Sequence, residues 1–204
     1  MSGNQKTTVS IAIFASGGGS NAEKIIERTI QPDKKLPVDF SVDLIVCNKP
    51  EAGVLKIAAK HGIDTLVIDK ERFFKGDGYV TELKARGIEF IVLAGFLWKI
   101  PVSVIQAYPQ KIINIHPALL PKYGGKGMYG DKVHNAIIEA GEKESGITIH
   151  YVDEIYDHGN IIFQATCAID KNDTSETLAQ KIHLLEHQHY PDVIVDLVQM
   201  QNSR

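Results

Sequence analysis

Short apolar runs recur along the chain, and stretches with a helical spacing of apolar and polar positions separate most of them. Most of the runs are apolar at every position, which is typical of strands that are buried on both faces of a sheet. Strands and helices that alternate in this way predict an α/β fold with a doubly wound, mainly parallel sheet flanked by helices. The strands are expected at residues 9–15, 42–47, 64–68, 90–94, 112–115, 147–152 and 161–169. The helices are expected at residues 21–30, 52–61, 79–86, 101–107, 132–141 and about 175–199.

The last two expected strands differ from the others because no helix separates them. They follow each other across a short turn that contains His158, Gly159 and Asn160, and a short connection favours antiparallel pairing. We therefore expect an antiparallel pair near the C-terminus. The sequence contains no internal repeat, low-complexity tract or linker, so residues 1–204 are expected to form a single domain.

Two polar side chains end the strand expected at residues 112–115. Asn114 and His116 are two positions apart, so on a strand they face the same side and would look into one pocket. Pro117 cannot continue a central strand, which places the pair at the carboxyl end, where open α/β sheets bind their ligands. Histidine can carry a proton near neutral pH, and an amide can donate to an oxygen that becomes negative. The pair therefore suits carbonyl chemistry, with a polar strand end as the structural alternative.

The first turn from strand to helix, at residues 15–21, contains three consecutive glycines. Glycine lets backbone amides approach an anion closely, and the N-terminus of the following helix adds unpaired N–H groups and a favourable dipole. A phosphate group is therefore the expected ligand. The turn is neither a Walker loop, because no Lys-Ser/Thr pair follows, nor a dinucleotide motif, because Asn21 and Ala22 stand where its third glycine should be. A tight turn with Ser20 as the helix N-cap is the alternative.

An acidic turn follows the strand expected at residues 147–152. Asp153, Glu154 and Asp157 lie in it, and any of the three carboxylates could face His116 across the cleft. A carboxylate beside an imidazole favours the charged imidazolium and orients the ring. The residues alone do not choose among the three, and a solvated acidic turn is the alternative.

Composition and charge exclude several classes of protein. The chain has 204 residues, of which 44% are hydrophobic and 23% charged, with a formal net charge of -3. It can bury a sizeable core, and its charge predicts no general attraction to nucleic acid or to an anionic membrane. Residues 1–8 lack the apolar stretch of a signal peptide, and no run reaches the roughly 18 apolar residues of a membrane span. We therefore expect a cytoplasmic protein.

Cysteine and histidine positions predict no metal site. Cys47 and Cys167 lie in strand-like runs without metal-ligand spacing, so we expect buried thiols in a reducing compartment. His183, His187 and His189 crowd the last helix, but no cysteine or carboxylate set accompanies them at ligand spacing. A partly exposed helical face is the simpler interpretation.

Four motifs together resemble the phosphoribosylglycinamide formyltransferase family, which is folate-dependent and acts in purine synthesis. The resemblance covers residues from about 9 to 198, and the third motif is typical of the wider group that uses formyltetrahydrofolate. The Rossmann-like formyltransferase fold of the family agrees with the sheet predicted above. The motifs are Gly19-Ser20-Asn21, Leu93-Ala94-Gly95-Phe96, Asn114-Ile115-His116-Pro117-Ala118-Leu119-Leu120-Pro121-Lys122-Tyr123 and Asp157-His158-Gly159.

The resemblance implies roles for individual residues. Asn114, His116 and Asp157 match the catalytic trio of the family, so Asp157 would be the carboxylate that faces the histidine. The loop that holds the substrate phosphate is matched by Gly19, Ser20 and Asn21, and the helical stretch that contacts the ribonucleotide by His183 and Glu186. The cosubstrate 10-formyltetrahydrofolate would be bound, largely through backbone groups, by Leu97, Trp98, Lys99, Ile100, Asn114, Asp153, Glu154, Ile155, Tyr156 and Asp157.

The sequence departs from the family at three places. An arginine that often meets the folate aligns near Gly76, so Arg72 or Lys75 is expected to replace it. Trp98 stands where a basic residue is common. The segment at residues 124–130 is longer and richer in glycine than usual, and we expect a mobile lid at residues 123–131, with a rigid surface turn as the alternative.

The reaction implied by the resemblance is direct formyl transfer to the amine of 5'-phosphoribosylglycinamide. Asn114 and a protonated His116 would stabilise the tetrahedral intermediate, and Asp157 would assist proton transfer through water. The expected partners are these small molecules, with no nucleic acid, no membrane, no metal and a monomer or weak homodimer as the assembly.

Three other activities are compatible with parts of this pattern. Formyltetrahydrofolate deformylase and methionyl-tRNA formyltransferase use similar residues. The deformylase usually carries an additional N-terminal domain, whereas the first strand here is expected by residue 9. Methionyl-tRNA formyltransferase usually carries an additional C-terminal domain. A non-catalytic nucleotide-binding module on the same sheet is the alternative from a different class.

Overall fold

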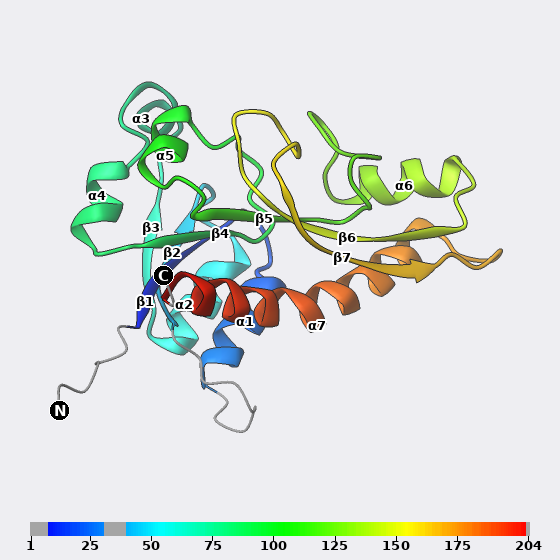
Figure 1. The fold of residues 1–204 in the computed structure, drawn as a ribbon, viewed down its shortest axis with the longest axis horizontal. Coiled ribbons are helices and arrows are strands. Elements are labelled where there is room, and N and C mark those ends of the chain that lie inside the picture. Colours follow the sequence, from blue (N-terminus) through cyan, green and yellow to red (C-terminus); the bar gives the residue numbers. More distant parts are fainter. Residues whose placement is uncertain (1–7, 31–39, 203–204) are drawn as a thin grey trace.

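Parallel strands and helices alternate through the first half of the computed structural model, which describes residues 8–30 and 40–202 (Figure 1). Within these residues one seven-stranded sheet has the order β3-β2-β1-β4-β5-β6-β7. The strands are β1 (Val9–Ala15), β2 (Phe40–Cys47), β3 (Asp64–Val67), β4 (Phe90–Leu93), β5 (Ile112–His116), β6 (Glu144–Tyr151) and β7 (Ile161–Ala168). The helices are α1 (Ser20–Ile30), α2 (Gly53–His61), α3 (Lys70–Lys75), α4 (Val80–Ala85), α5 (Val102–Ala107), α6 (Asp131–Glu139) and α7 (Ser175–Asn202).

Alternate side chains of the central strands point to opposite faces of the sheet and form two apolar cores. On β1, Ile11 and Ile13 join one core, whereas Ala12 and Phe14 join the other. The first face is covered by α1, α2 and α7, and the second by α3, α4 and α5 (Figure 1). Burial on both faces explains why these strands are apolar at every position.

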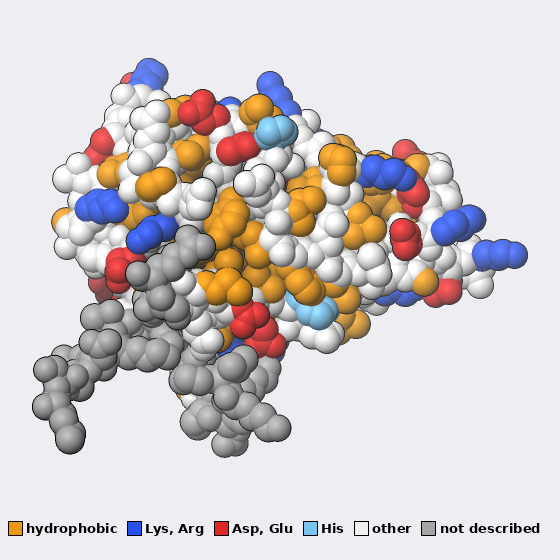
Figure 2. Space-filling view, in the orientation of Figure 1, with side chains coloured by type: hydrophobic (Ala, Val, Ile, Leu, Met, Phe, Trp, Pro, Cys, Tyr) orange, Lys and Arg blue, Asp and Glu red, His pale blue; other side chains and the backbone are white. Residues whose placement is uncertain are grey.

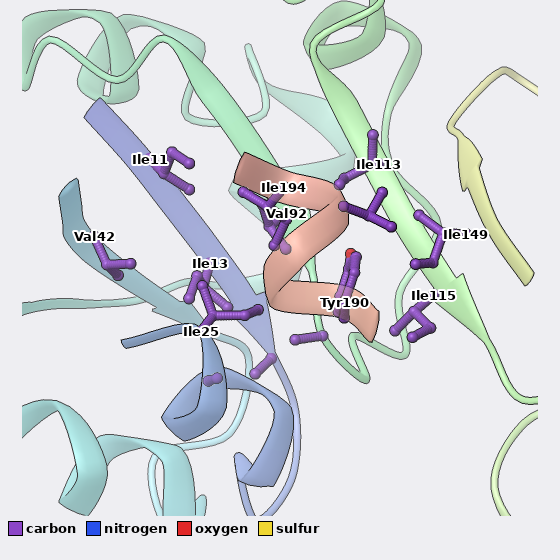
Figure 3. Packing of buried hydrophobic residues seen from close by; sticks show 14 of the residues in the cluster. Ile11, Ile13, Ile25, Val42, Val92, Ile113, Ile115, Ile149, Tyr190 and Ile194 are labelled. Carbon is purple, nitrogen blue, oxygen red and sulfur yellow. The ribbon is translucent and has the colours of Figure 1, made fainter. Parts of the chain in front are cut away.

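Helix α7 is fixed to the first face by a large aromatic side chain. Tyr190 lies among isoleucine side chains such as Ile113 and Ile149 (Figure 3). Its hydroxyl donates to the carbonyl of Leu93, at the end of β4, over 2.9 Å. Because a buried hydroxyl without a partner is costly, this bond both satisfies Tyr190 and sets the position of α7 next to the carboxyl ends of the strands.

The predicted α/β class, the parallel order of the early strands and the antiparallel C-terminal pair are confirmed. Two elements differ from the prediction. Helix α3 is too short for a periodic pattern and is defined instead by its cap, in which the Asp69 carboxylate accepts from the N–H of Arg72. Strand β6 begins at Glu144, before the predicted start at residue 147. Gly146 lies inside the strand, where an added Cβ would collide with the Ala165 carbonyl oxygen. That glycine permits close strand approach and does not mark a turn.

The two cysteines are not equally buried. Cys47 is enclosed in the core, as expected, but Cys167 is only half-buried. The prediction of a buried thiol is therefore wrong for Cys167. Cys167 packs against the first core from β7, which lies at the edge of the sheet and covers its side chains only in part.

The surface carries both signs of charge. Figure 2 shows acidic and basic side chains alternating around the rim of one face, with apolar side chains gathered in its middle. Among residues 8–30 and 40–202, no helix is long and apolar enough to cross a membrane. Residues 1–7, on which the expected lack of a signal peptide mainly depends, lie outside the described residues.

Candidate active site

The carboxyl ends of β1, β4 and β5 open into a cavity of about 520 Å³, called here the larger cavity. This volume is typical of small-molecule sites. The glycine turn at residues 17–21 lines the cavity together with Asn114, His116 and Asp157. The structure therefore brings together the two polar motifs that lie far apart in the sequence, as the sheet topology predicts.

The glycine turn is held from two sides. The carbonyl of Gly17 accepts from the N–H of Val54 at the start of α2 (3.1 Å), and the Ser16 hydroxyl accepts from the N–H of Leu97 (2.9 Å). The carbonyl of Gly19 accepts the first bond of α1, from Glu23 (2.9 Å). Gly19, and not Ser20, therefore stands at the N-cap, and the turn presents the amino end of an eleven-residue helix to the cavity.

Only one of the three glycines is required by packing. Gly19 has a positive φ of 86°, and an added Cβ would lie 2.8 Å from Val54. An added Cβ at Gly17 or Gly18 meets nothing within 4 Å, although both residues line the larger cavity. Two glycines thus leave open the space that an anion at the helix terminus would use.

Asn114 is oriented by a buried histidine that the sequence motifs do not single out. The Asn114 amide donates to Nε2 of His150 over 3.1 Å, and Nδ1 of His150 donates to the Tyr151 carbonyl over 2.8 Å. The two bonds are mutually consistent, because a histidine that donates through Nδ1 can accept at Nε2. His150 is 2% exposed and lies opposite Asn114 in the β5–β6 register. The sequence signal for it is a polar residue on an apolar strand that pairs with β5.

His116 lies between a carbonyl and a carboxylate. Its Nε2 donates to the Tyr123 carbonyl over 2.8 Å, and its Nδ1 lies 3.6 Å from Oδ2 of Asp157. The Asp157 carboxylate also accepts from the N–H of Gly125 over 2.8 Å. Tyr123 and Asp157 both have positive φ angles, 56° and 53°, which for residues other than glycine is a strained conformation that often occurs at functional sites.

Burial and charge act on His116 in opposite directions. Burial lowers the pKa of His116 below its ordinary value, and the Asp157 carboxylate raises it only in part. Burial would raise the pKa of Asp157, but His150, His116 and the Gly125 N–H together bring it below its ordinary value. The two directions together favour a charged carboxylate beside a neutral imidazole in the free protein.

A second polar group lies beside the glycine turn. The Glu186 side chain, which is 5% exposed, accepts through Oε2 from the Asn21 amide (2.9 Å) and from Nδ1 of His183 (3.0 Å). The hydrogen bond that His183 donates to Glu186 raises the pKa of His183, whereas burial lowers it by a smaller amount. All three residues line the larger cavity, so Asn21 of the expected phosphate loop lies beside His183 and Glu186, which were expected to contact the ribonucleotide.

A smaller cavity of about 70 Å³ adjoins the larger one, and Asn114 and Asp157 line both. Of the residues expected around the folate, Leu97 lines the larger cavity and Glu154 lines neither. The others around the smaller cavity are Trp98, Lys99, Ile100, Asp153, Ile155 and Tyr156. At about 70 Å³ this space is well below the roughly 300 Å³ at which ligand pockets typically begin.

Neither basic residue expected to meet the folate lines the larger or the smaller cavity. Arg72 stacks on the ring of Tyr79 at 3.9 Å and pairs with Glu82 at 3.3 Å, while Lys75 pairs with Glu71 at 3.0 Å. Lys99 instead lines the smaller cavity, with its ammonium 5.6 Å from the Tyr156 ring. In the described residues, no group of three or more His, Cys, Asp or Glu side chains is placed to hold a metal ion.

Residues 9–194 match the family described as formyl transferase. The chain is 44% identical over 189 residues to the chloroplastic phosphoribosylglycinamide formyltransferase of Arabidopsis thaliana, which covers 90% of this chain and 63% of that protein. It is 40% identical over 195 residues to the phosphoribosylglycinamide formyltransferase of Bacillus subtilis, with 94% and 95% covered. The chain thus spans slightly less than two thirds of the Arabidopsis protein.

Solved structures with this architecture are also similar. The crystal structure of phosphoribosylglycinamide formyltransferase from Bacillus halodurans superposes with a TM-score of 0.81 at 38% identity, covering 93% of this chain and 95% of that one. Glycinamide ribonucleotide transformylase 1 from Geobacillus kaustophilus gives a TM-score of 0.83 at 34% identity, with 93% and 98% covered.

Proposed function

The chain belongs to the formyl transferase family, and on that premise we propose that it transfers the formyl group of 10-formyltetrahydrofolate to the amine of 5'-phosphoribosylglycinamide. This is a step of de novo purine biosynthesis. One observation carries the proposal: Asn114 and Asp157 line the wall shared by the two cavities, and the larger cavity ends at a glycine turn suited to phosphate. The names of the similar proteins support the same activity.

The reaction begins when the substrate amine attacks the formyl carbon and forms a new carbon–nitrogen bond. The carbonyl oxygen then becomes negative. Asn114 uses one N–H for His150, so its second N–H can donate to this oxygen. Removing one such donor typically costs about 10²- to 10³-fold in kcat.

His116 would take the proton that the attacking amine loses. Its Nε2 already donates to the Tyr123 carbonyl, so the acceptor in the neutral ring is Nδ1, which faces Asp157 at 3.6 Å. The imidazolium formed there is stabilised by the Asp157 charge and by the nearby oxyanion. The same proton then passes to the leaving nitrogen as its bond to the formyl carbon breaks, and tetrahydrofolate is released. No covalent enzyme intermediate is needed.

The folate would enter the smaller cavity, whose walls combine the apolar Ile100 and Trp98 with the Asp157 carboxylate. Because that space is too small for a bicyclic ring, the loop that contains residues 153–157 has to move outward. We further propose that residues 1–204 act as one formyltransferase domain, in the cytoplasm, as a monomer or weak homodimer.

The test is to follow tetrahydrofolate release with and without phosphoribosylglycinamide. Release that requires the amine, with formyl phosphoribosylglycinamide as the product, supports the proposal. Equal release in both reactions would instead indicate a deformylase, because water would then be the acceptor. Binding of the ribonucleotide without any release would indicate a non-catalytic nucleotide-binding module. The Asn114→Ala variant serves as the control for uncatalysed hydrolysis.

A further inference from the structure

A buried histidine on α6 has no role in the reaction described above. His134 is 3% exposed and shares the inward face of its helix with Val133 and Ile137, which belong to the first core. It nevertheless lines the larger cavity. A polar ring held in an apolar helix face usually has a hydrogen-bond partner, because burial without one is costly.

His134 forms no such bond with the described residues. Its Nδ1 is sealed from solvent and has no partner in residues 8–30 and 40–202. Only Nδ1 of the ring is sealed without a partner, which leaves Nε2 as the nitrogen available to a ligand in the cavity. With no partner to fix the position of the ring proton, Nε2 can either donate or accept, depending on the group that it meets.

His134 is within electrostatic range of both ends of the cavity. The charges that act on its ring include those of His183 and Glu186, at the glycine-turn end, and of His116, at the catalytic end. Burial, the largest effect, lowers the pKa of His134, so the ring is neutral at pH 7. A neutral ring suits an uncharged hydroxyl better than a second phosphate, which a cationic side chain would favour.

A ribonucleotide whose phosphate lies at the glycine turn and whose amine reaches Asn114 must place its pentose between them. We propose that His134 binds a ribose hydroxyl of the ribonucleotide through Nε2 and so adds to the affinity for that substrate. Glu186, which lines the same cavity, accepts its two protein bonds through Oε2, so its other carboxylate oxygen is left for a second hydroxyl of the sugar. This inference rests on the proposed function and adds a residue that recognises the pentose.

Three substitutions separate a hydrogen bond at Nε2 from a packing role. His134→Leu removes both nitrogens and should raise the KM for the ribonucleotide about tenfold, which corresponds to one lost hydrogen bond. The kcat and the KM for 10-formyltetrahydrofolate should change less than threefold. His134→Gln places an amide near the position of Nε2 and should recover part of the loss, whereas His134→Asn places it near Nδ1 and should not.

A matched control is His61→Leu. His61 ends α2, and its Nε2 is also buried without a partner in the described residues, but it lines neither cavity. Its substitution should leave both KM values unchanged. Equal KM values for wild type and His134→Leu, with wild-type melting temperatures, would overturn the inference, as would equal recovery by Asn and Gln.

A spectroscopic measurement covers the case in which His134→Leu fails to fold. In protein labelled with ¹⁵N-histidine, the His134 ring signal is identified by its loss in His134→Gln. Saturating phosphoribosylglycinamide should shift the wild-type Nε2 signal, and an unchanged signal would contradict the inference. If wild type transfers the formyl group and the His134 substitutions leave the KM for the ribonucleotide unchanged, this inference alone is rejected. Absence of transfer by wild type would reject the proposed function, and the same titration would still test whether His134 meets the ribonucleotide.

Discussion

The two cavities that meet at Asn114 differ in size and in what forms their walls. The larger, of about 520 Å³, is bounded at one end by backbone groups of the glycine turn, which is tied to α2 and to Leu97, and by the buried Glu186 bonds. The smaller, of about 70 Å³, is closed by side chains of an exposed loop, including Ile155 and Tyr156. The cavity proposed for the ribonucleotide is therefore preformed, whereas the cavity proposed for the folate has to open before it can bind a ligand of that size.

The largest effect is expected where the two sides meet. Asn114→Ala and His116→Ala should each lower kcat by about 10²-fold or more, because each removes a group that stabilises charge or moves a proton in the transition state. The measurement is steady-state kinetics, with circular dichroism to show that the variants are folded. Near-normal turnover by either variant would remove that residue from the catalytic pair.

Asp157→Asn should have the next largest effect, roughly 10- to 100-fold on kcat. Asn tolerates the positive φ of this position, so the fold should survive. The Asp157 charge raises the pKa of His116, so its loss should lower that pKa further. Because the neutral ring is the proton acceptor, activity should fall as the pH drops through the His116 pKa. In the variant, this acidic limb of the pH–activity profile should move to lower pH. An NMR titration with an unchanged His116 pKa would contradict the contact.

The glycine turn allows a test of the preformed side alone. Gly18→Ala should raise the KM for the ribonucleotide about tenfold, because its methyl group would occupy the space left for phosphate. Folate binding and the melting temperature should change little. Gly19→Ala is the contrasting variant, since its Cβ would collide with Val54, and it should lower stability. Equal losses of ribonucleotide and folate binding in Gly18→Ala, measured by calorimetry, would argue against a phosphate site.

The smallest effect is expected in hydrogen exchange. Amides of residues 153–157 should exchange faster than those of the glycine turn in the free protein, and a folate analogue should slow them. The predicted lid at residues 123–131 can be followed in the same data. Equal exchange at residues 124–130 with and without both ligands would leave that segment a rigid turn.

Periodicity predicted most of the sheet, and motif position placed Asn114 and the glycine turn each at the carboxyl end of a strand. The structure shows that the two meet, because strand ends in a parallel sheet converge. The sequence did not predict roles for His150 or His134. Each is one polar residue in an apolar element, and its role can be inferred only from the groups around it in the folded structure. The charge state of His116 was also out of reach. It depends on how completely the fold buries the ring, which the sequence does not encode locally.

The position of the segment at residues 123–125 is coupled to the charges of His116 and Asp157. Tyr123 accepts from His116, and Gly125 donates to Asp157. The first contact raises the pKa of His116 and the second lowers the pKa of Asp157, so both favour the ionised pair. By linkage, ionisation must stabilise the closed segment to the same extent. Protonation of His116 during the reaction would therefore strengthen the contacts of Tyr123 and Gly125 while the intermediate exists. These contacts would weaken again when the proton leaves with the product.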